Sequence, residues 1–156
     1  MSFLKKEYSQ YQKKIGKSVG PTKWIKINQQ KIDQFAKLTK DPQFIHTDPI
    51  KAEQFSPFGK TIAHGFFILS LASKFAIDVL PPIKKNEVRI NYGFNKIRFV
   101  HPVIVDSKIR GIFSLKEIEK KNEFTLVKTY DFTIEIQNIQ KPAIVAEWII
   151  LNKYLE

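Results

Sequence analysis

The spacing of apolar residues along the chain changes from a helical period to a strand period near residue 86. Before this point, apolar residues recur every three or four positions, which predicts amphipathic helices. After it, apolar and polar residues alternate, which predicts strands with one buried face. We expect helices over residues 3–15, 29–39, 49–55 and 64–80, and strands over residues 24–27, 88–99, 107–117, 124–137 and 143–151. Asn28 and Asp48 are the expected N-caps of the second and third helices.

Residues 64–80 form the most apolar of the expected helices. Almost no polar face remains between Phe66 and Leu80, and a helix that is apolar all round is a buried helix. Pro81 and Pro82 end it, because proline lacks the N–H that would continue the helix. One sheet cannot cover such a helix on every side, so a second wrap of sheet or a partner subunit is needed. We therefore expect a homo-oligomer, most simply an isologous homodimer.

The second half of the chain is predicted to form an antiparallel sheet. The alternation slips just after Gly93, which predicts a β-bulge or bend in the first long strand. Turns expected at residues 120–122 and 138–142 would join antiparallel neighbours. Helices that lie against one curved antiparallel sheet make an α+β architecture.

Length and composition narrow the class of protein. A chain of 156 residues with 43% apolar residues predicts a single domain over residues 1–156, with residues 1–20 as a helical extension. The chain has no cysteine, so disulfides and thiolate metal sites are excluded. The first residues lack the apolar stretch of a signal peptide, and no apolar run approaches the length of a membrane span. We therefore expect a cytoplasmic protein with no membrane partner.

The net charge of +11 is spread over the whole chain without a long basic run. Most of it is therefore assigned to a solvated surface, and the alternative is attraction of an anionic ligand such as a phosphate-bearing acyl carrier. A nucleic-acid partner would rest on net charge alone, because no helix-turn-helix, RNA-recognition or zinc-finger signature is present. We expect no nucleic-acid partner.

The first candidate site is a carboxylate and an imidazole in the loop after the 29–39 helix. Asp41 and His46 are five positions apart, so a bent loop can point both side chains at one water molecule. Such a pair can take a proton from water and return one to carbon, as hydration of an activated double bond requires. The spacing alone also fits a turn-capping Asp and a structural His, so it leaves both readings open.

The second candidate site is His64-Gly65 at the head of the apolar helix. Glycine leaves its N–H unobstructed there, and the helix dipole favours negative charge on a ligand. A thioester oxygen that becomes enolate-like would be stabilised at this position. An ordinary helix start would look the same. His101 is expected at the surface, and three scattered histidines lack the spacing of a known ligand set, so we expect no metal.

Taken together, the two sites resemble the hydratase signature of the MaoC-like dehydratase family, which contains the R-specific enoyl-CoA hydratases. The matching residues are Phe35-Ala36, Thr39, Asp41, Ile45-His46, Asp48, Ala52, Phe55, Pro57 and Ile62-Ala63-His64-Gly65. The sequences of residues 41–46, 56–59 and 62–66, with Trp24 and Gln29 upstream, are most similar to the nodulation-protein-N-like branch. The chain departs from many hydratases in having Gln43-Phe44 in place of Asn-Pro.

This resemblance implies a hot-dog fold, a long helix wrapped by an antiparallel sheet, which is usually dimeric. It also implies hydration of trans-2-enoyl-CoA to (R)-3-hydroxyacyl-CoA without a cofactor. By position, Asp41 and His46 correspond to the catalytic pair of the family. The Gly65 amide, with His64 beside it, corresponds to the group that holds the thioester carbonyl. Ser73 corresponds to a serine near the catalytic water, and Ser70 is its neighbouring alternative.

The remaining expectations concern the substrate. The acyl chain would lie along the apolar helix, against Phe66, Phe67 and Leu69, and the anionic carrier would meet Lys60 or Arg98. The sequence leaves open whether the carrier is CoA or acyl carrier protein. A hot-dog fold also hosts thioesterases and non-catalytic acyl-thioester binding proteins, which remain the alternative.

Overall fold

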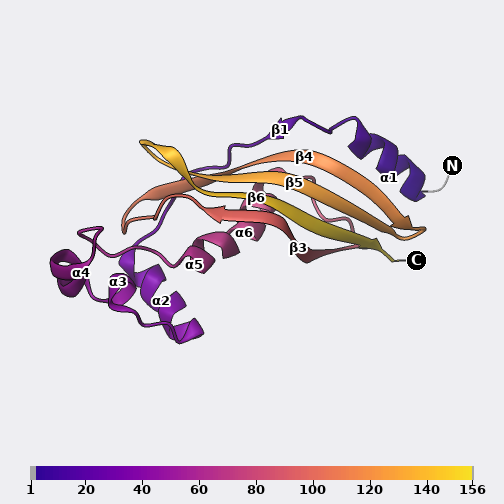
Figure 1. The fold of residues 1–156 in the computed structure, drawn as a ribbon. Coiled ribbons are helices and arrows are strands. Elements are labelled where there is room, and N and C mark those ends of the chain that lie inside the picture. The colour runs from indigo at the N-terminus through magenta and orange to yellow at the C-terminus, as the bar shows by residue number, and fades with distance from the viewer. Residues whose placement is uncertain (1–2, 156) are drawn as a thin grey trace.

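The computed structural model describes residues 3–155 as helices lying against one curved antiparallel sheet (Figure 1). The helices are α1 (Phe3–Gln12), α2 (Gln29–Thr39), α3 (Phe44–Thr47), α4 (Pro49–Phe55), α5 (Gly65–Ser70) and α6 (Ala72–Val79). The strands are β1 (Ser18–Val19), β2 (Ile25–Lys26), β3 (Glu87–Phe99), β4 (Lys108–Asn122), β5 (Thr125–Ile136) and β6 (Ile139–Tyr154). The strand order β1-β4-β5-β6-β3, with β2 also paired to β4, confirms the α+β class and the hot-dog arrangement.

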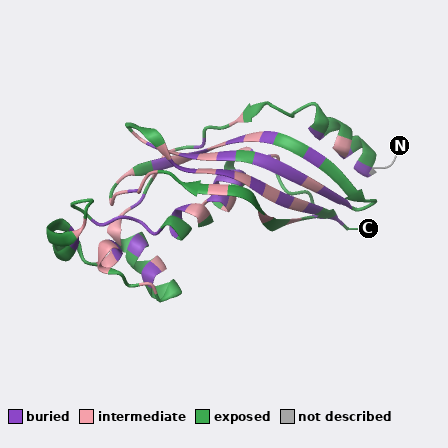
Figure 2. Cartoon of the chain, in the orientation of Figure 1, coloured by how far each residue is buried: buried purple, intermediate pink, exposed green. Residues whose placement is uncertain are grey.

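Over much of β4 and β6, buried residues alternate with more exposed ones, as the sequence pattern predicts, whereas the edge strand β3 is mostly exposed (Figure 2). In β5, the inward face packs Phe132 and Ile134 into the core. The slip predicted after Gly93 is present, because the β3–β6 register shifts on both sides of Phe94. The β4–β5 turn falls at residues 123–124 rather than 120–122, since pairing of β4 continues to Asn122. The β5–β6 turn is tighter than expected, and Asn138 adopts a positive φ of 63° in it.

The central helix differs from its prediction in two ways. It is divided at Leu71 into α5 and α6, which lie on the same face of the sheet (Figure 1). It is also covered by the chain's own sheet on one side only, because Phe66 and Ile77 are each 71% exposed. The sheet therefore covers one side of this apolar helix. The opposite side, which is also apolar, is exposed to solvent in the single chain.

Helices α2, α3 and α4 form a lobe at one end of the sheet (Figure 1). The predicted caps are confirmed, since Asn28 accepts from the Lys31 N–H and Asp48 accepts from the Lys51 N–H. Residues 44–47 were expected as loop but form the short helix α3. The segment before α5 runs antiparallel to residues 103–105, which ties the lobe to the end of the sheet.

Helix α1 lies at the opposite end of the molecule, beside the turn of β4 and β5 (Figure 1). It ends at Gln12 rather than at Ile15. Its Tyr11 ring covers the ammonium of Lys128, which is only 1% exposed and 3.4 Å from the ring centroid. No helix within residues 3–155 is long and apolar enough to cross a membrane.

Candidate active site

Three side chains from separate segments meet where the helical lobe joins the sheet. Asp41 follows α2, His46 lies in α3, and His64 immediately precedes α5. One ring nitrogen from each histidine and one carboxylate oxygen of Asp41 all lie within 4.8 Å of one another. The predicted pairing of Asp41 with His46 is therefore present in space, and His64, which the sequence placed beside the thioester, joins it.

His46 is held in one tautomer. Its Nδ1 is 2.7 Å from the Ile62 carbonyl oxygen, and a carbonyl can only accept, so Nδ1 carries the hydrogen. The lone pair is then on Nε2, the nitrogen that can accept a proton. Burial lowers the pKa of His46, and nearby His64 lowers it further, while the bond to Ile62 and the charge of Asp41 act in the opposite direction. His46 is therefore neutral at pH 7, with the Nε2 lone pair able to accept a proton.

Gln29 fixes the main chain around His46, a role that the sequence analysis missed. Its Nε2 donates to the His46 carbonyl oxygen at 2.6 Å, and its Oε1 accepts from the Thr61 hydroxyl at 2.6 Å. Because Thr61 directly precedes Ile62, the same side chain ties the backbone of His46 to the segment that orients its imidazole. In the sequence, Gln29 stood out only as part of the family resemblance, since its partners are far away along the chain.

His64 lies against both members of the predicted pair. Its ring stacks on that of His46, with centroids 3.7 Å apart and planes inclined by 23°. Its Nε2 donates to the Asp41 carbonyl oxygen at 3.0 Å, and the Asp41 carboxylate lies 4.0 Å from the same nitrogen. Phe35 also packs against His64, with ring centroids 5.1 Å apart and planes inclined by 53°.

Gly65 packs closely against the ring of Phe99. A Cβ built at this position would lie 2.8 Å from Cδ1 of Phe99, which is closer than packed carbon atoms approach. Gly65 and Phe99 also line a cavity of about 260 Å³ between α5 and the sheet end. His101 is half-buried rather than exposed as predicted, and its Nδ1 donates to the Pro102 carbonyl oxygen at 2.8 Å.

The other expected site residues do not join this cluster within one chain. Phe67 packs into the core on Phe35, with ring centroids 5.3 Å apart, whereas Phe66 faces outward and meets Phe99 edge to face. Ser73 lies on α6, where its hydroxyl accepts from Asn91 at 3.5 Å. Ser70 donates back to the Phe67 carbonyl oxygen within its own helix.

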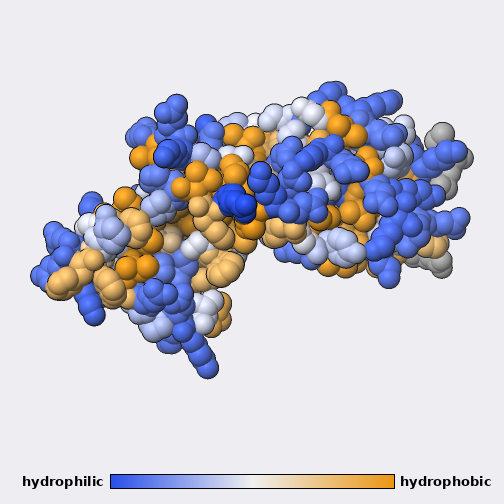
Figure 3. All heavy atoms as spheres, in the orientation of Figure 1, coloured by the Kyte–Doolittle hydropathy of each residue, from blue (hydrophilic) through white to orange (hydrophobic). Residues whose placement is uncertain are grey.

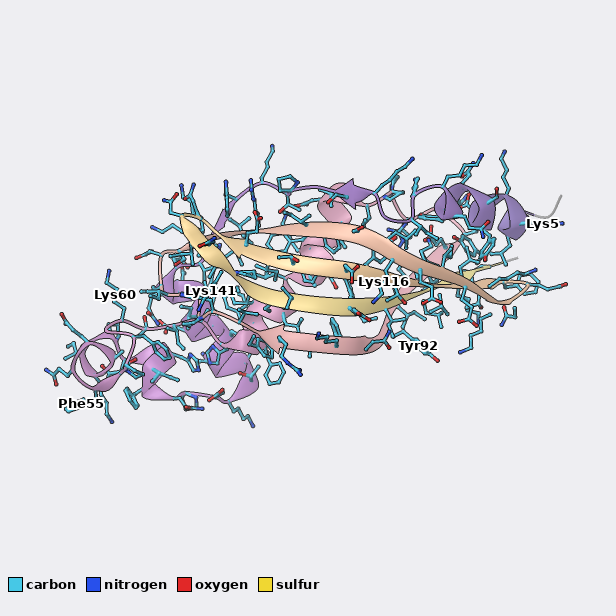
Figure 4. All side chains as sticks on the ribbon, turned by 45° about the horizontal axis from the view of Figure 1, so that its top comes forward. Lys5, Phe55, Lys60, Tyr92, Lys116 and Lys141 are labelled. Atoms are coloured by element: carbon cyan, nitrogen blue, oxygen red, sulfur yellow. The ribbon has the colours of Figure 1, made fainter. Side chains whose placement is uncertain are left out.

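The two cations expected at the carrier are both exposed. Lys60 lies in the loop between α4 and α5, at the same end of the molecule as Phe55 and opposite Lys5 (Figure 4). Arg98 lies near the end of β3 and donates to the Ile97 carbonyl oxygen. Both are therefore near the lobe that holds Asp41 and His46, and neither is part of the cluster.

Proximity alone would admit a metal ion between Asp41, His46 and His64. A histidine ligand needs the ion in its ring plane, about 2 Å from the nitrogen. The ring planes of His46 and His64 are nearly parallel and stacked 3.7 Å apart, so one ion cannot lie in both. The arrangement favours proton transfer, and we continue to expect no metal.

Comparison with known proteins adds the family. The family model described as MaoC like domain matches residues 10–136. The chain is 43% identical over 141 residues to nodulation protein N of Rhizobium leguminosarum bv. viciae, covering 90% of this chain and 88% of that protein. It is 41% identical over 135 residues to 3-hydroxyacyl-thioester dehydratase Z of Mycobacterium tuberculosis, covering 86% and 88%. The solved (R)-hydratase from A. caviae involved in PHA biosynthesis has the same fold, with a TM-score of 0.70 at 21% identity over 91% of this chain and 96% of that one.

Proposed function

Because the chain belongs to the MaoC-like domain family, we propose that it interconverts trans-2-enoyl thioesters and (R)-3-hydroxyacyl thioesters by adding or removing water. The observation that supports this most directly is the convergence of a carboxylate, Asp41, with a neutral imidazole, His46, whose Nε2 lone pair is available. The names of two similar proteins, a 3-hydroxyacyl-thioester dehydratase and an (R)-hydratase, agree with this reaction.

In the hydration direction, His46 Nε2 takes a proton from a water molecule that Asp41 orients by accepting its other hydrogen bond. The water oxygen attacks the β carbon, and the electron pair of the double bond moves toward the thioester carbonyl. The imidazolium then returns the proton to the α carbon, so atoms and charge balance over the cycle. Dehydration runs through the same steps in reverse.

The Gly65 amide, in the first turn of α5, would polarise the thioester carbonyl while negative charge develops on its oxygen. The acyl chain would follow the central helix, where Phe66 and Phe67 offer apolar surface, and Ser73 would contact the substrate or its water. Lys60 or Arg98 would meet the anionic end of the carrier, which is CoA or acyl carrier protein. No cofactor is needed, because the reaction moves only a proton and a hydroxyl group.

We also propose that the working form is a cytoplasmic homodimer paired through β3. This strand is the edge of the sheet, so its outer backbone groups are available for pairing. Exposed apolar side chains flank it: Phe66 and Ile77 on the helices, and Val88, Ile90, Tyr92, Phe94 and Phe99 on the strand. Hydrophobic atoms reach the surface between the lobe and the sheet (Figure 3), and Tyr92 projects from the sheet edge (Figure 4). A second copy would cover the apolar side of the central helix.

The test of the reaction is loss of the enoyl-thioester absorbance with purified protein and crotonyl-CoA, then octenoyl-CoA and a carrier-protein thioester. We expect wild-type protein to bleach the band and to form the (R)-3-hydroxy product, and His46→Gln to lose at least about 100-fold in turnover. Asp131→Asn, a change on the exposed outer face of β5, is the control and should keep wild-type activity. No bleaching with any of the three thioesters would overturn the proposal, and release of free thiol instead would favour a thioesterase.

The dimer is tested separately by light scattering. Wild-type protein should have twice the mass of one chain, and Ile90→Lys, which places a charge on the apolar edge, should halve it. A wild-type monomer at micromolar concentration would contradict pairing through β3 without affecting the assignment of the reaction.

A further inference from the structure

His64 is the most deeply buried residue of the cluster. It is 3% exposed, and its main chain is held on both sides. The preceding residue, Ala63, donates its N–H to the Val103 carbonyl oxygen at 2.8 Å, and the following residue, Gly65, begins α5. Its ring is packed between neighbours, because the His46 ring stacks on it at 3.7 Å and the Phe35 ring centroid lies 5.1 Å away. Such a ring is a rigid support for its neighbours.

The first neighbour that it supports is Asp41. The chain reverses direction here, since Lys40 adopts a left-handed conformation with φ of 57° and the Asp41 N–H returns to the Ala36 carbonyl oxygen. The Asp41 side chain remains 43% exposed, so packing does not hold the carboxylate. The bond from His64 Nε2 to the Asp41 carbonyl oxygen is the contact that joins this reversal to the base of α5.

The second neighbour is His46. Its bond to the Ile62 carbonyl oxygen sets which nitrogen carries the hydrogen, but one hydrogen bond leaves the ring free to rock about its side-chain bond. The stacked ring of His64 removes this freedom by fixing the plane of the imidazole. Tautomer and ring plane together define where the Nε2 lone pair points, and proton transfer depends on both.

We infer that His64 is a positioning residue that anchors the main chain of Asp41, from which the carboxylate extends, and fixes the ring plane of His46, rather than a residue that binds substrate. This inference rests on the proposed hydratase function. It differs from the expectation that the sequence raised, in which His64 contacts the thioester beside Gly65. Its buried ring and committed Nε2 support the new assignment.

Two substitutions separate the two contacts. His64→Phe keeps a flat ring against His46 and removes the donor to Asp41, whereas His64→Gln keeps a donor of similar reach and removes the stacked ring. We expect each variant to lower kcat by about 10- to 100-fold, as displacement of reacting groups by a fraction of an ångström does, with KM within about threefold of wild type. Asp131→Asn, on the outer face of β5, is again the control.

The pH profile adds a readout that a merely structural role would not move. Within residues 3–155, the titratable groups that act on His46 are His64 and Asp41, and His64 lowers the pKa of His46. Both variants should therefore move the acidic limb of kcat/KM to higher pH. A raised KM with unchanged kcat would overturn the inference in favour of substrate binding, and wild-type kinetics in both variants would overturn it outright.

A measurement without substrate keeps this inference distinct from the proposed reaction. NMR titration of the His46 Hε1 signal reports its pKa and the ring-current shift from the stacked imidazole. We expect His64→Gln to remove the ring-current shift and both variants to raise the pKa of His46. An unchanged His46 signal in both folded variants would contradict the positioning role even if wild-type protein hydrates no thioester.

Discussion

The Thr61 hydroxyl donates a 2.6 Å hydrogen bond to Gln29 Oε1, and through this bond the first residue of α2 is joined to the strand-like segment before α5. Thr61 is almost fully buried, and the Gln29 amide also binds the His46 carbonyl oxygen. The Gln29 side chain therefore joins the main chain of His46 to the segment whose Ile62 carbonyl oxygen binds the His46 imidazole.

Replacing Gln29 by Leu should weaken both folding and catalysis. The substitution keeps the volume but leaves the Thr61 hydroxyl and the His46 carbonyl oxygen without this partner, and a buried unpaired polar group costs about 1–3 kcal/mol. We expect a comparable loss in the free energy of unfolding by urea and a lower kcat with little change in KM. Gln29→Glu, which keeps the acceptor for Thr61, should recover part of the stability. If Gln29→Leu is as stable as wild type, the two hydrogen bonds of Gln29 do not stabilise this part of the fold.

Asp41 and His46 should behave as one unit in mutant kinetics. Asp41→Asn and His46→Gln are each expected to lower kcat/KM at least about 100-fold, because each removes one half of the acid-base pair. The double variant should lose little more than the worse single variant, since groups that act in the same step are not additive. Losses that multiply in the double variant would show that the two residues act in separate steps.

The depressed pKa of His46 predicts the low-pH behaviour of the enzyme. Burial and the nearby His64 lower the pKa of His46 below its ordinary value of 6.5, so the imidazole stays neutral to lower pH. As the pH falls, kcat/KM should therefore begin to decrease at a lower pH than it would with an unperturbed histidine. The unfolded chain binds a proton on this residue near pH 6.5 and the folded chain does not, so stability should decline as pH falls below 6.5. Urea unfolding between pH 5 and pH 7 measures this slope, and His46→Gln should reduce it.

Gly65→Ala should destabilise the protein because of Phe99 rather than because of backbone conformation. The added methyl group would lie 2.8 Å from the Phe99 ring, and overpacking of this kind costs about 1–3 kcal/mol. Phe99→Leu in the same chain should restore much of the thermal stability, because a smaller side chain leaves room for the methyl group. If Gly65→Ala lowers the stability equally in the wild-type and Phe99→Leu backgrounds, contact with Phe99 is not the cause.

Lys128 should make stability rise with pH above neutrality. Burial beneath Tyr11 lowers its pKa from 10.5 to about 7, so between these values the unfolded chain binds a proton that the folded chain does not. Burial raises the pKa of Tyr130 and Tyr154, so those residues reverse the trend once unfolded tyrosine ionises near pH 10. Unfolding free energies from pH 7 to pH 9.5 should therefore increase for wild-type protein and stay flatter for Lys128→Met.

Much of the candidate site could be predicted from the order of residues. Asp41 and His46 are only five positions apart, and a reversal at Lys40 followed by the short helix α3 is enough to bring them together. The same locality explains why the caps Asn28 and Asp48 and the slip after Gly93 were predicted correctly. Each depends on backbone geometry and side chains within a few residues of one another.

The features that the sequence did not disclose depend on contacts between distant segments. Lys128 had the inward register between Leu126 and Tyr130, but only the docking of α1 supplies the Tyr11 ring that covers its charge. Likewise, the apolar sequence of the central helix does not say which side the sheet covers, and Phe66 and Ile77 remain exposed in the single chain.

The fold class, the caps and the closeness of Asp41 to His46 followed from the sequence, because periodicity, capping and short loops are set by neighbouring residues. The bond from Gln29 to the His46 carbonyl oxygen, the stacking of His64 on His46 and the close packing of Phe99 on Gly65 are visible only in the folded chain. Hydrogen bonds and ring contacts between segments far apart in the sequence depend on how the lobe and the sheet pack together. That packing is a property of the whole core and is not encoded in any local pattern.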